Sequence, residues 1–171
     1  MPGQLDRSDD SLQRLTAGAA HLRVAEKDLH REIYHAAHDV GVPQRLISEV
    51  VGSISQATVQ RIIRRIDEDP SRLEETPAEV IDRRAAGLID DETMMEMLLN
   101  RTYSFGHVPS IEGIATDAYI RGDWDQIETA YYRDLLSEGE FSQLMERQRD
   151  QLEEAARTEQ AAEAEQAVQS Y

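Results

Sequence analysis

The chain contains no cysteine, which excludes a disulfide framework, a thiolate nucleophile and a cysteine metal site. Aromatic residues make up only 5% of its 171 residues, and no apolar run is long enough to serve as a signal peptide or to span a membrane. Apolar residues still amount to 40%, which is enough for a modest core. Together these features suit a cytoplasmic protein in a reducing compartment.

Motifs of catalysis are also absent from the sequence. There is no phosphate-binding glycine loop and no nucleophile motif, so we expect neither enzymatic activity nor a cofactor. His35 and His38 lie three residues apart, with Glu32 three residues before His35, a spacing that permits a metal pair on one helix. No separate ligand segment accompanies them, and we expect no metal site.

Negative charge is abundant and unevenly distributed. The net charge is -16. Residues 1–72 hold 10 Lys+Arg against 11 Asp+Glu, a net of -1, whereas residues 73–150 hold 7 against 18, a net of -11, and residues 151–171 hold 1 against 5, a net of -4. Nucleic-acid affinity depends on neutralising phosphates, so only the N-terminal portion is suited to it.

A long helical pattern follows an N-terminal segment, residues 1–7, that we expect to be disordered. It runs over residues 8–38 with apolar positions spaced alternately by three and four, a heptad stripe in which Glu26 fills one gap. The stripe comprises Leu12, Leu15, Ala19, Leu22, Leu29, Ile33, Ala36 and Val40. Two interpretations remain open: a helix through which two chains dimerise, or an amphipathic helix that packs on its own domain.

Two shorter helices are predicted between Pro43 and Ile66. The first covers residues 44–51, and Gly52-Ser53-Ile54 forms the turn after it. Ser55 is a suitable N-cap for the second, whose buried side comprises Val59, Ile62, Ile63 and Ile66. The sequence Asp-Glu-Asp-Pro at residues 67–70 ends this helix, which completes a domain over residues 8–69.

An acidic helical domain is predicted over residues 76–150, after a linker at residues 70–75. Its helix starts are marked by Thr76 with Glu79, Asp90 or Asp91, Asp123 with Gln126, and Ser137 with Glu140. Residues 101–122 show no clear periodicity, and residues 151–171 form a helical or disordered tail. The expected fold class is therefore all-α.

The segment SQATVQRII at residues 55–63 resembles the recognition helices of bacterial and phage helix-turn-helix transcriptional regulators, antitoxin-type regulators among them. LISEVVG at residues 46–52 resembles the helix before it, and the likeness covers residues 32–66. This chain departs from the usual pattern by one additional residue in the turn, Gly-Ser-Ile-Ser at residues 52–55. The resemblance implies sequence-specific binding of double-stranded DNA and transcriptional control, with repression by a homodimer on a palindromic or repeated site as the expected form.

Candidate contacts follow from the outward side of the second helix. Glutamine suits adenine edges and arginine suits guanine edges, so the candidate base contacts are Gln56, Ala57, Gln60 and Arg61. Candidate phosphate contacts, which position the protein without reading sequence, are Gln44, Arg45, Ser55, Thr58, Arg64 and Arg65. The alternative is a structural helical bundle with a basic exposed face. The absence of any acidic residue between Ser55 and Ile66 favours the first interpretation.

Aromatic residues gather between Tyr103 and Tyr132, and they have two interpretations. They form the small core of the acidic domain, or they form a surface for a protein partner, with Tyr103, Phe105, Tyr119 and Trp124 as candidates. RTYSFGHVP and DAYIRGDWDQI, residues 101–109 and 117–127, are similar to small uncharacterised actinobacterial proteins, a likeness that implies no activity. The alternative function is an antitoxin-like protein whose acidic C-terminal region binds and neutralises a basic protein partner.

Overall fold

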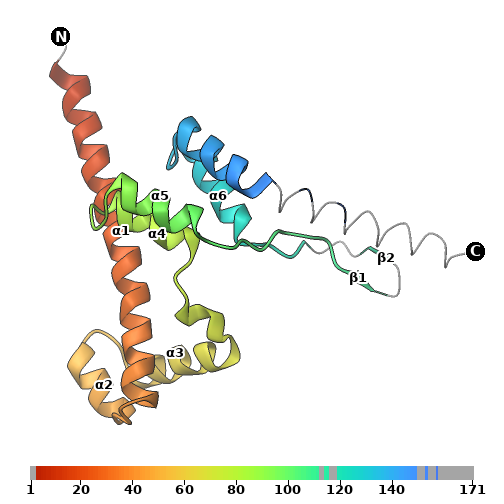
Figure 1. Ribbon diagram of the computed structural model, residues 1–171. Coiled ribbons are helices and arrows are strands. Elements are labelled where there is room, and N and C mark those ends of the chain that lie inside the picture. The colour runs from red at the N-terminus through yellow and green to blue at the C-terminus, as the bar shows by residue number, and fades with distance from the viewer. Residues whose placement is uncertain (1–2, 112–113, 116–118, 150–152, 154–156, 158–171) are drawn as a thin grey trace, which may run out of the picture. The chain divides into compact units, whose positions relative to one another are not determined.

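The structure is a computed structural model that describes residues 3–111, 114–115, 119–149, 153 and 157 (Figure 1). Its regular secondary structure in these residues is helical, except for one antiparallel pair of two-residue strands and an isolated bridge, so the expected all-α class is confirmed. The chain forms two compact units, Met1–Leu88 and Ile89–Tyr171, which we describe separately as unit 1 and unit 2. None of the described helices combines the length and the apolar content that crossing a membrane requires.

Unit 1 is built on one long helix. Its elements are α1 (Gly3–His38), α2 (Gln44–Val51), α3 (Gln56–Glu68), the 3-10 helix η1 (Pro70–Leu73) and α4 (Pro77–Ala85). The expected disorder of residues 1–7 is wrong for residues 3–7, which belong to α1; residues 1–2 lie outside the described part. The segment contains no proline after Pro2, and acidic residues near a helix N-terminus favour the helix.

The core of unit 1 lies where α1, α2 and α3 meet. The buried cluster consists of Ile33, Ile47, Val59, Ile62, Ile63 and Ile66, and it includes the whole predicted inner side of α3. Five of these six positions are β-branched isoleucines whose stiff side chains suit a closely packed interior. This packing fixes α3 against α1 and leaves the opposite side of α3 to solvent.

The turn between α2 and α3 is held by short-range hydrogen bonds. Gly52 has a left-handed φ of 73°, and its N–H donates to the carbonyl of Ser48. The Ser48 hydroxyl donates to the carbonyl of Ile54 across 2.8 Å, and the Ser55 hydroxyl accepts from the N–H of Thr58. The hydrogen bond from Ser48 of α2 therefore holds this longer turn in place. Ser55 is confirmed as the N-cap of α3.

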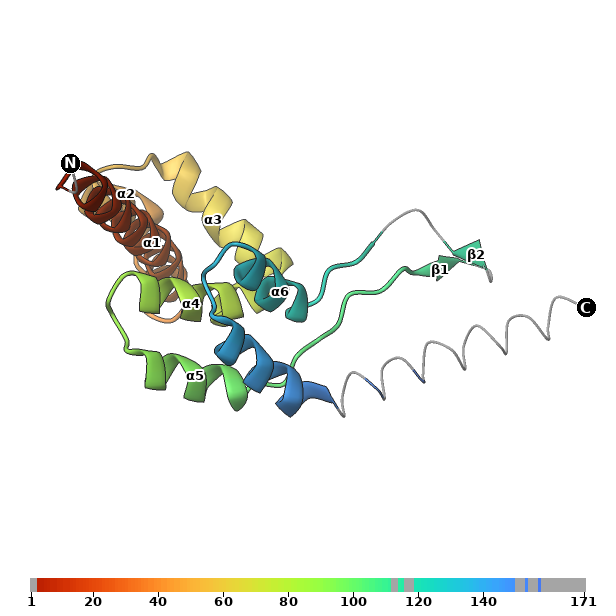
Figure 2. The ribbon, with the colours of Figure 1, turned by 90° about the horizontal axis from the view of Figure 1, so that it is seen from above.

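Helix α4 packs against α1 and belongs to unit 1, so the boundary between the two parts differs from the expected one. The predicted linker at residues 70–75 contains η1, and the division falls between Leu88 and Ile89. Figure 2, which looks nearly along α1, shows α3 and α4 beside it. Arg31 of α1 bonds to Glu79 of α4 at 2.6 Å, and Arg83 bonds to Asp28 at 2.8 Å. These long-range ion pairs are the physical reason for the difference.

Unit 2 contains α5 (Asp91–Leu99), β1 (Ser110–Ile111), β2 (Ile114–Ala115), α6 (Trp124–Tyr132) and a further helix over residues 138–149. The strands pair antiparallel inside the segment for which the sequence showed no periodicity. The buried core of this unit comprises Met94, Leu98, Tyr103, Trp124, Ile127, Ala130, Leu136 and Leu144.

Helix starts in unit 2 agree with the sequence in two of three cases. Asp90 accepts from the N–H of Thr93, and Ser137 forms the expected reciprocal capping pair with Glu140. Asp123 makes no side-chain cap; instead Asp125 accepts from the N–H of Gly122 at 2.9 Å. Of the tail at residues 151–171, only Glu153 and Arg157 are described, both helical, and the rest lies outside the described residues.

Candidate nucleic-acid interface

Helix α3 presents one continuous polar side opposite its buried isoleucines. The four candidate base contacts, Gln56, Ala57, Gln60 and Arg61, are all exposed. The spacing of 3.6 residues per turn places Gln56 beneath Gln60 and Ala57 beneath Arg61. The structure therefore brings these four residues together in the first two turns of α3, at the end that Ser55 caps.

The Arg61 side chain is positioned by its neighbours. Its Nη2 donates to Thr58 Oγ1 at 2.9 Å, and Thr58 Oγ1 lies 3.1 Å from Ser55 Oγ. Arg61 makes no ion pair with any residue that the structure describes. It therefore keeps guanidinium donors for an external acceptor, while Ser55 and Thr58 are engaged in ordering the first turn of α3.

The remaining phosphate candidates fall into two places. Gln44 and Arg45 begin α2, where Arg45 Nε lies 2.9 Å from Glu49. On α3, Arg64 Nε lies 3.6 Å from Glu68. Both ion pairs are solvent-exposed, and such pairs contribute only about 0–1 kcal/mol. A phosphate can therefore replace either carboxylate at little cost.

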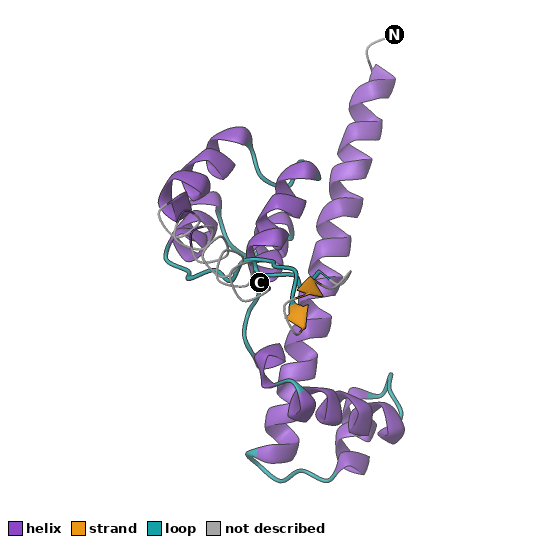
Figure 3. Ribbon diagram, turned by 90° about the vertical axis from the view of Figure 1, so that its right-hand side faces the viewer, coloured by secondary structure: helices purple, strands orange, loops and turns teal. Residues whose placement is uncertain are grey.

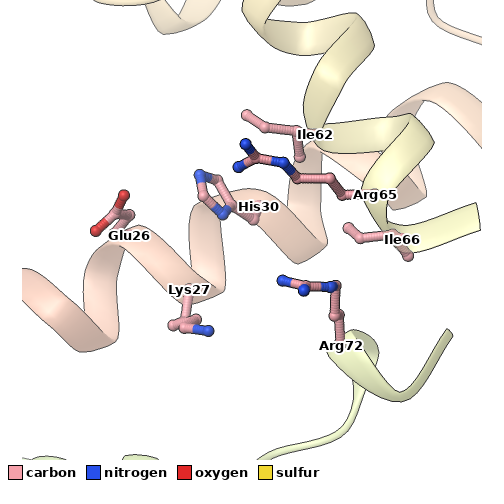
Figure 4. A pocket seen from close by; sticks show the side chains of 7 residues that line it. All are labelled: Glu26, Lys27, His30, Ile62, Arg65, Ile66 and Arg72. Atoms are coloured by element: carbon pink, nitrogen blue, oxygen red, sulfur yellow. The ribbon is translucent and has the colours of Figure 1, made fainter. Parts of the chain in front are cut away.

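Arg65 lies on another flank of α3, in a pocket of about 220 Å³ between α1, α3 and η1. The lining residues are Glu26, Lys27, His30, Ile62, Arg65, Ile66 and Arg72. Figure 4 shows the guanidinium groups of Arg65 and Arg72 extending toward the turn of α1 that carries His30. We call Lys27, Arg65 and Arg72 the basic pocket cluster.

Sequence reasoning missed Lys27, His30 and Arg72, because they come from elements far apart in the chain. Arg72 Nε lies 3.3 Å from Asp69, whereas Lys27 and Arg65 have no ion pair among the described residues. Burial lowers the pKa of His30 below its ordinary value, and the charges of Lys27 and Arg65 lower it further against the opposing effect of Glu26. His30 therefore lines the pocket as a neutral imidazole at neutral pH.

Acidic groups near the end of α3 are bound within unit 1. The Tyr34 hydroxyl donates to Asp67 at 3.1 Å, and His38 Nε2 lies 3.3 Å from the same carboxylate. His35 Nδ1 instead contacts Asp39 at 2.7 Å, so the two histidines have different acidic partners. The described residues contain no group of three side chains suited to a metal ion.

The aromatic candidates in unit 2 do not form one exposed surface. Tyr103 and Trp124 are core residues whose rings meet edge to face at 5.2 Å, so for these two the core interpretation is confirmed and the partner surface is wrong. Burial raises the pKa of Tyr103 to about 12, and its hydroxyl donates to the carbonyl of Leu98. Phe105 is half-buried, and Tyr119 is exposed and donates to Asp125.

No protein-family model, curated protein or solved structure matches the chain.

Proposed function

We propose that the chain is a sequence-specific DNA-binding protein that represses transcription, with α2 and α3 as a helix-turn-helix and α3 as the helix that enters the major groove. The observation that carries the proposal is the exposed side of α3, which presents Gln56, Gln60 and Arg61 to solvent. The opposite side of the same helix is anchored by its buried isoleucines. Their side chains have the donors and acceptors that distinguish adenine and guanine edges. The rigid core beneath them keeps these groups in register.

The distribution of charge between the two units supports the same proposal. Unit 1 holds 12 Lys+Arg against 15 Asp+Glu, a net of -3, whereas unit 2 holds 6 against 19, a net of -13. In this proposal unit 2 is an acidic helical domain that does not touch DNA. The negative charge of unit 2 repels DNA phosphates, so contact with DNA is restricted to the surface around α3.

The first test is a selection of bound fragments from a random DNA pool at near-physiological salt. The full-length chain is expected to enrich one motif, and the Gln60→Ala/Arg61→Ala variant is expected to lose it. Each side chain contributes about 1–3 kcal/mol of base discrimination, which corresponds to roughly 5–150-fold in affinity. Arg121→Ala is the matched control, because it removes an exposed arginine from unit 2. Absence of any enriched motif contradicts the proposal.

The basic pocket cluster gives a second prediction, in which Lys27 and Arg72 contact a DNA phosphate beside Arg65. The Lys27→Met/Arg72→Gln variant is expected to lose affinity for the specific site and for unrelated DNA by the same factor. Each lost phosphate contact lowers the slope of log affinity against log salt by about 0.9. Arg14→Gln, which removes an exposed arginine of α1, is the control. An unchanged salt slope shows that DNA does not reach the pocket.

A further inference from the structure

Helix α1 carries leucines that the described residues of unit 1 leave exposed. Leu12, Leu15 and Leu22 are 61%, 68% and 70% exposed, and Leu29, one heptad after Leu22, is 37% exposed. We call these four residues the leucine stripe. Contiguous exposed leucines on one helix face are uncommon in isolated proteins and mark a surface that another molecule covers.

The same helix face is covered farther along α1. Ile33 lies eleven residues after Leu22, three turns along the same stripe, and it is buried under α2 and α3. An apolar groove of about 360 Å³ between α1 and α2 adjoins the stripe, with Leu29, Leu46 and Val50 among its lining residues. Figures 1 and 3 show α2 and α3 at the end of α1 remote from the N-terminus. The bare leucines therefore continue an apolar surface that the chain buries elsewhere.

Gly18 is a second, independent sign of a missing neighbour. It lies in the middle of α1, where glycine destabilises a helix relative to alanine. A Cβ at this position would meet nothing within 4 Å, so no contact with the residues described in unit 1 explains the glycine. Close approach of another helix backbone does explain it, because Gly18 and Ala19 have no side chain, or only a methyl group, to keep a neighbouring helix at a distance.

We propose that a second copy of this chain covers the leucine stripe, with its α1 running antiparallel to the first and the two-fold axis close to Gly18. In this register Leu12 lies opposite Leu22 of the second copy, and Leu15 lies opposite Ala19. The same patch is used by both copies, as a two-fold interface requires. Leucines repeating every seven residues then form the seam of a two-helix coiled coil.

The antiparallel direction follows from what else occupies the helix face. From Ile33 onward α2 and α3 lie on the side of the stripe, so two parallel copies in register would bring these helices into collision. Parallel pairing also places Glu26 against Glu26 in the seam, where like charges repel. The antiparallel register avoids both problems.

The first experiment is sedimentation equilibrium of the full chain without DNA, which keeps it independent of the proposed function. The expected mass is twice 19.4 kDa. Leu15→Glu/Leu22→Glu is expected to give the single-chain mass with unchanged far-UV circular dichroism. Gln13→Glu/His21→Glu, which adds the same charge to exposed positions of α1 off the stripe, is expected to remain dimeric. A monomeric parent chain, or a dimer that survives the leucine changes, overturns the proposal.

The second experiment tests the direction, and the absence of native cysteine makes it direct. Leu12→Cys and Leu22→Cys chains are oxidised separately and as a mixture. The antiparallel register brings residue 12 of one copy within disulfide reach of residue 22 of the other, so cross-linked dimers are expected only in the mixture. Cross-linking of either variant alone shows parallel pairing. The complete absence of cross-links shows that the register is wrong, and either result overturns the proposed arrangement.

Discussion

Replacing Ile33 by alanine is expected to lower the free energy of unfolding of unit 1 by about 2–5 kcal/mol. Ile33 is 2% exposed and lies in the cluster that joins α1 to α2 and α3. Removing three buried carbons forfeits their transfer free energy, and the cavity that remains adds to the loss. Val40→Ala is the matched control, because Val40 is 76% exposed and its truncation is expected to change stability by less than about 0.5 kcal/mol.

The single tryptophan allows the two units to be followed separately in this experiment. Trp124 is buried in unit 2, so its fluorescence reports that unit, whereas circular dichroism reports the helices of both. In urea, Ile33→Ala is expected to shift the circular-dichroism transition and to leave the Trp124 transition in place. Equal shifts of both signals contradict independent folding of the units. No shift of either contradicts the packing of α1 on α2 and α3.

Local signals in the sequence were sufficient for most helix starts and for the core of α3. Ser55, Thr76 with Glu79, and Ser137 with Glu140 act on backbone groups within three residues, so their roles depend little on the rest of the fold. The inner side of α3 was also predictable, because a helix with one apolar stripe has only one side to bury. The positions of its outward residues follow from the same periodicity.

Long-range partners were beyond the reach of sequence patterns. Arg31 and Glu79 are 48 residues apart, and Arg83 and Asp28 are 55 apart, so nothing in their local sequence links them. The assignment of α4 to unit 1 depends on these pairs, so the sequence alone placed the boundary too early, at residues 70–75. The basic pocket cluster was missed for the same reason. In the sequence, Tyr103 and Trp124 flank a glycine-rich segment that is typical of an exposed loop. In the structure, their rings are buried in the core of unit 2.

Glycine at position 122 illustrates how the segment before α6 is constrained by close packing. A Cβ there would lie 2.3 Å from the carbonyl oxygen of Ser104, and this oxygen accepts from the N–H of Trp124 at 3.1 Å. Any larger residue must push residues 104–106 away from the start of α6. The tight approach therefore requires glycine at this position.

Replacing Glu79 by alanine is expected to destabilise unit 1 by about 3 kcal/mol, within the range for breaking a buried ion pair. The Glu79 side chain is 8% exposed, and its two oxygens have separate roles. One accepts from Arg31 Nη2 at 2.6 Å, and the other accepts from the N–H and the hydroxyl of Thr76 at 3.0 Å. The substitution therefore removes the capping box of α4 and takes the shorter of two carboxylate partners from the largely buried guanidinium of Arg31, which keeps Asp28 at 3.1 Å.

The exposed pair of Arg14 and Asp10 on α1 supplies the matched control for Glu79. Its side chains are 70% and 60% exposed, so Asp10→Ala is expected to cost less than about 1 kcal/mol. Glu79→Ala is also expected to weaken the binding of every DNA sequence. Glu79 holds Arg31, and Arg31 donates to the carbonyl of Leu73 in η1, the helix that carries Arg72 of the basic pocket cluster. A Glu79→Ala chain as stable as the Asp10→Ala chain shows that α4 is not an integral part of unit 1. The boundary then returns to residues 70–75, and η1 becomes the linker that the sequence predicted.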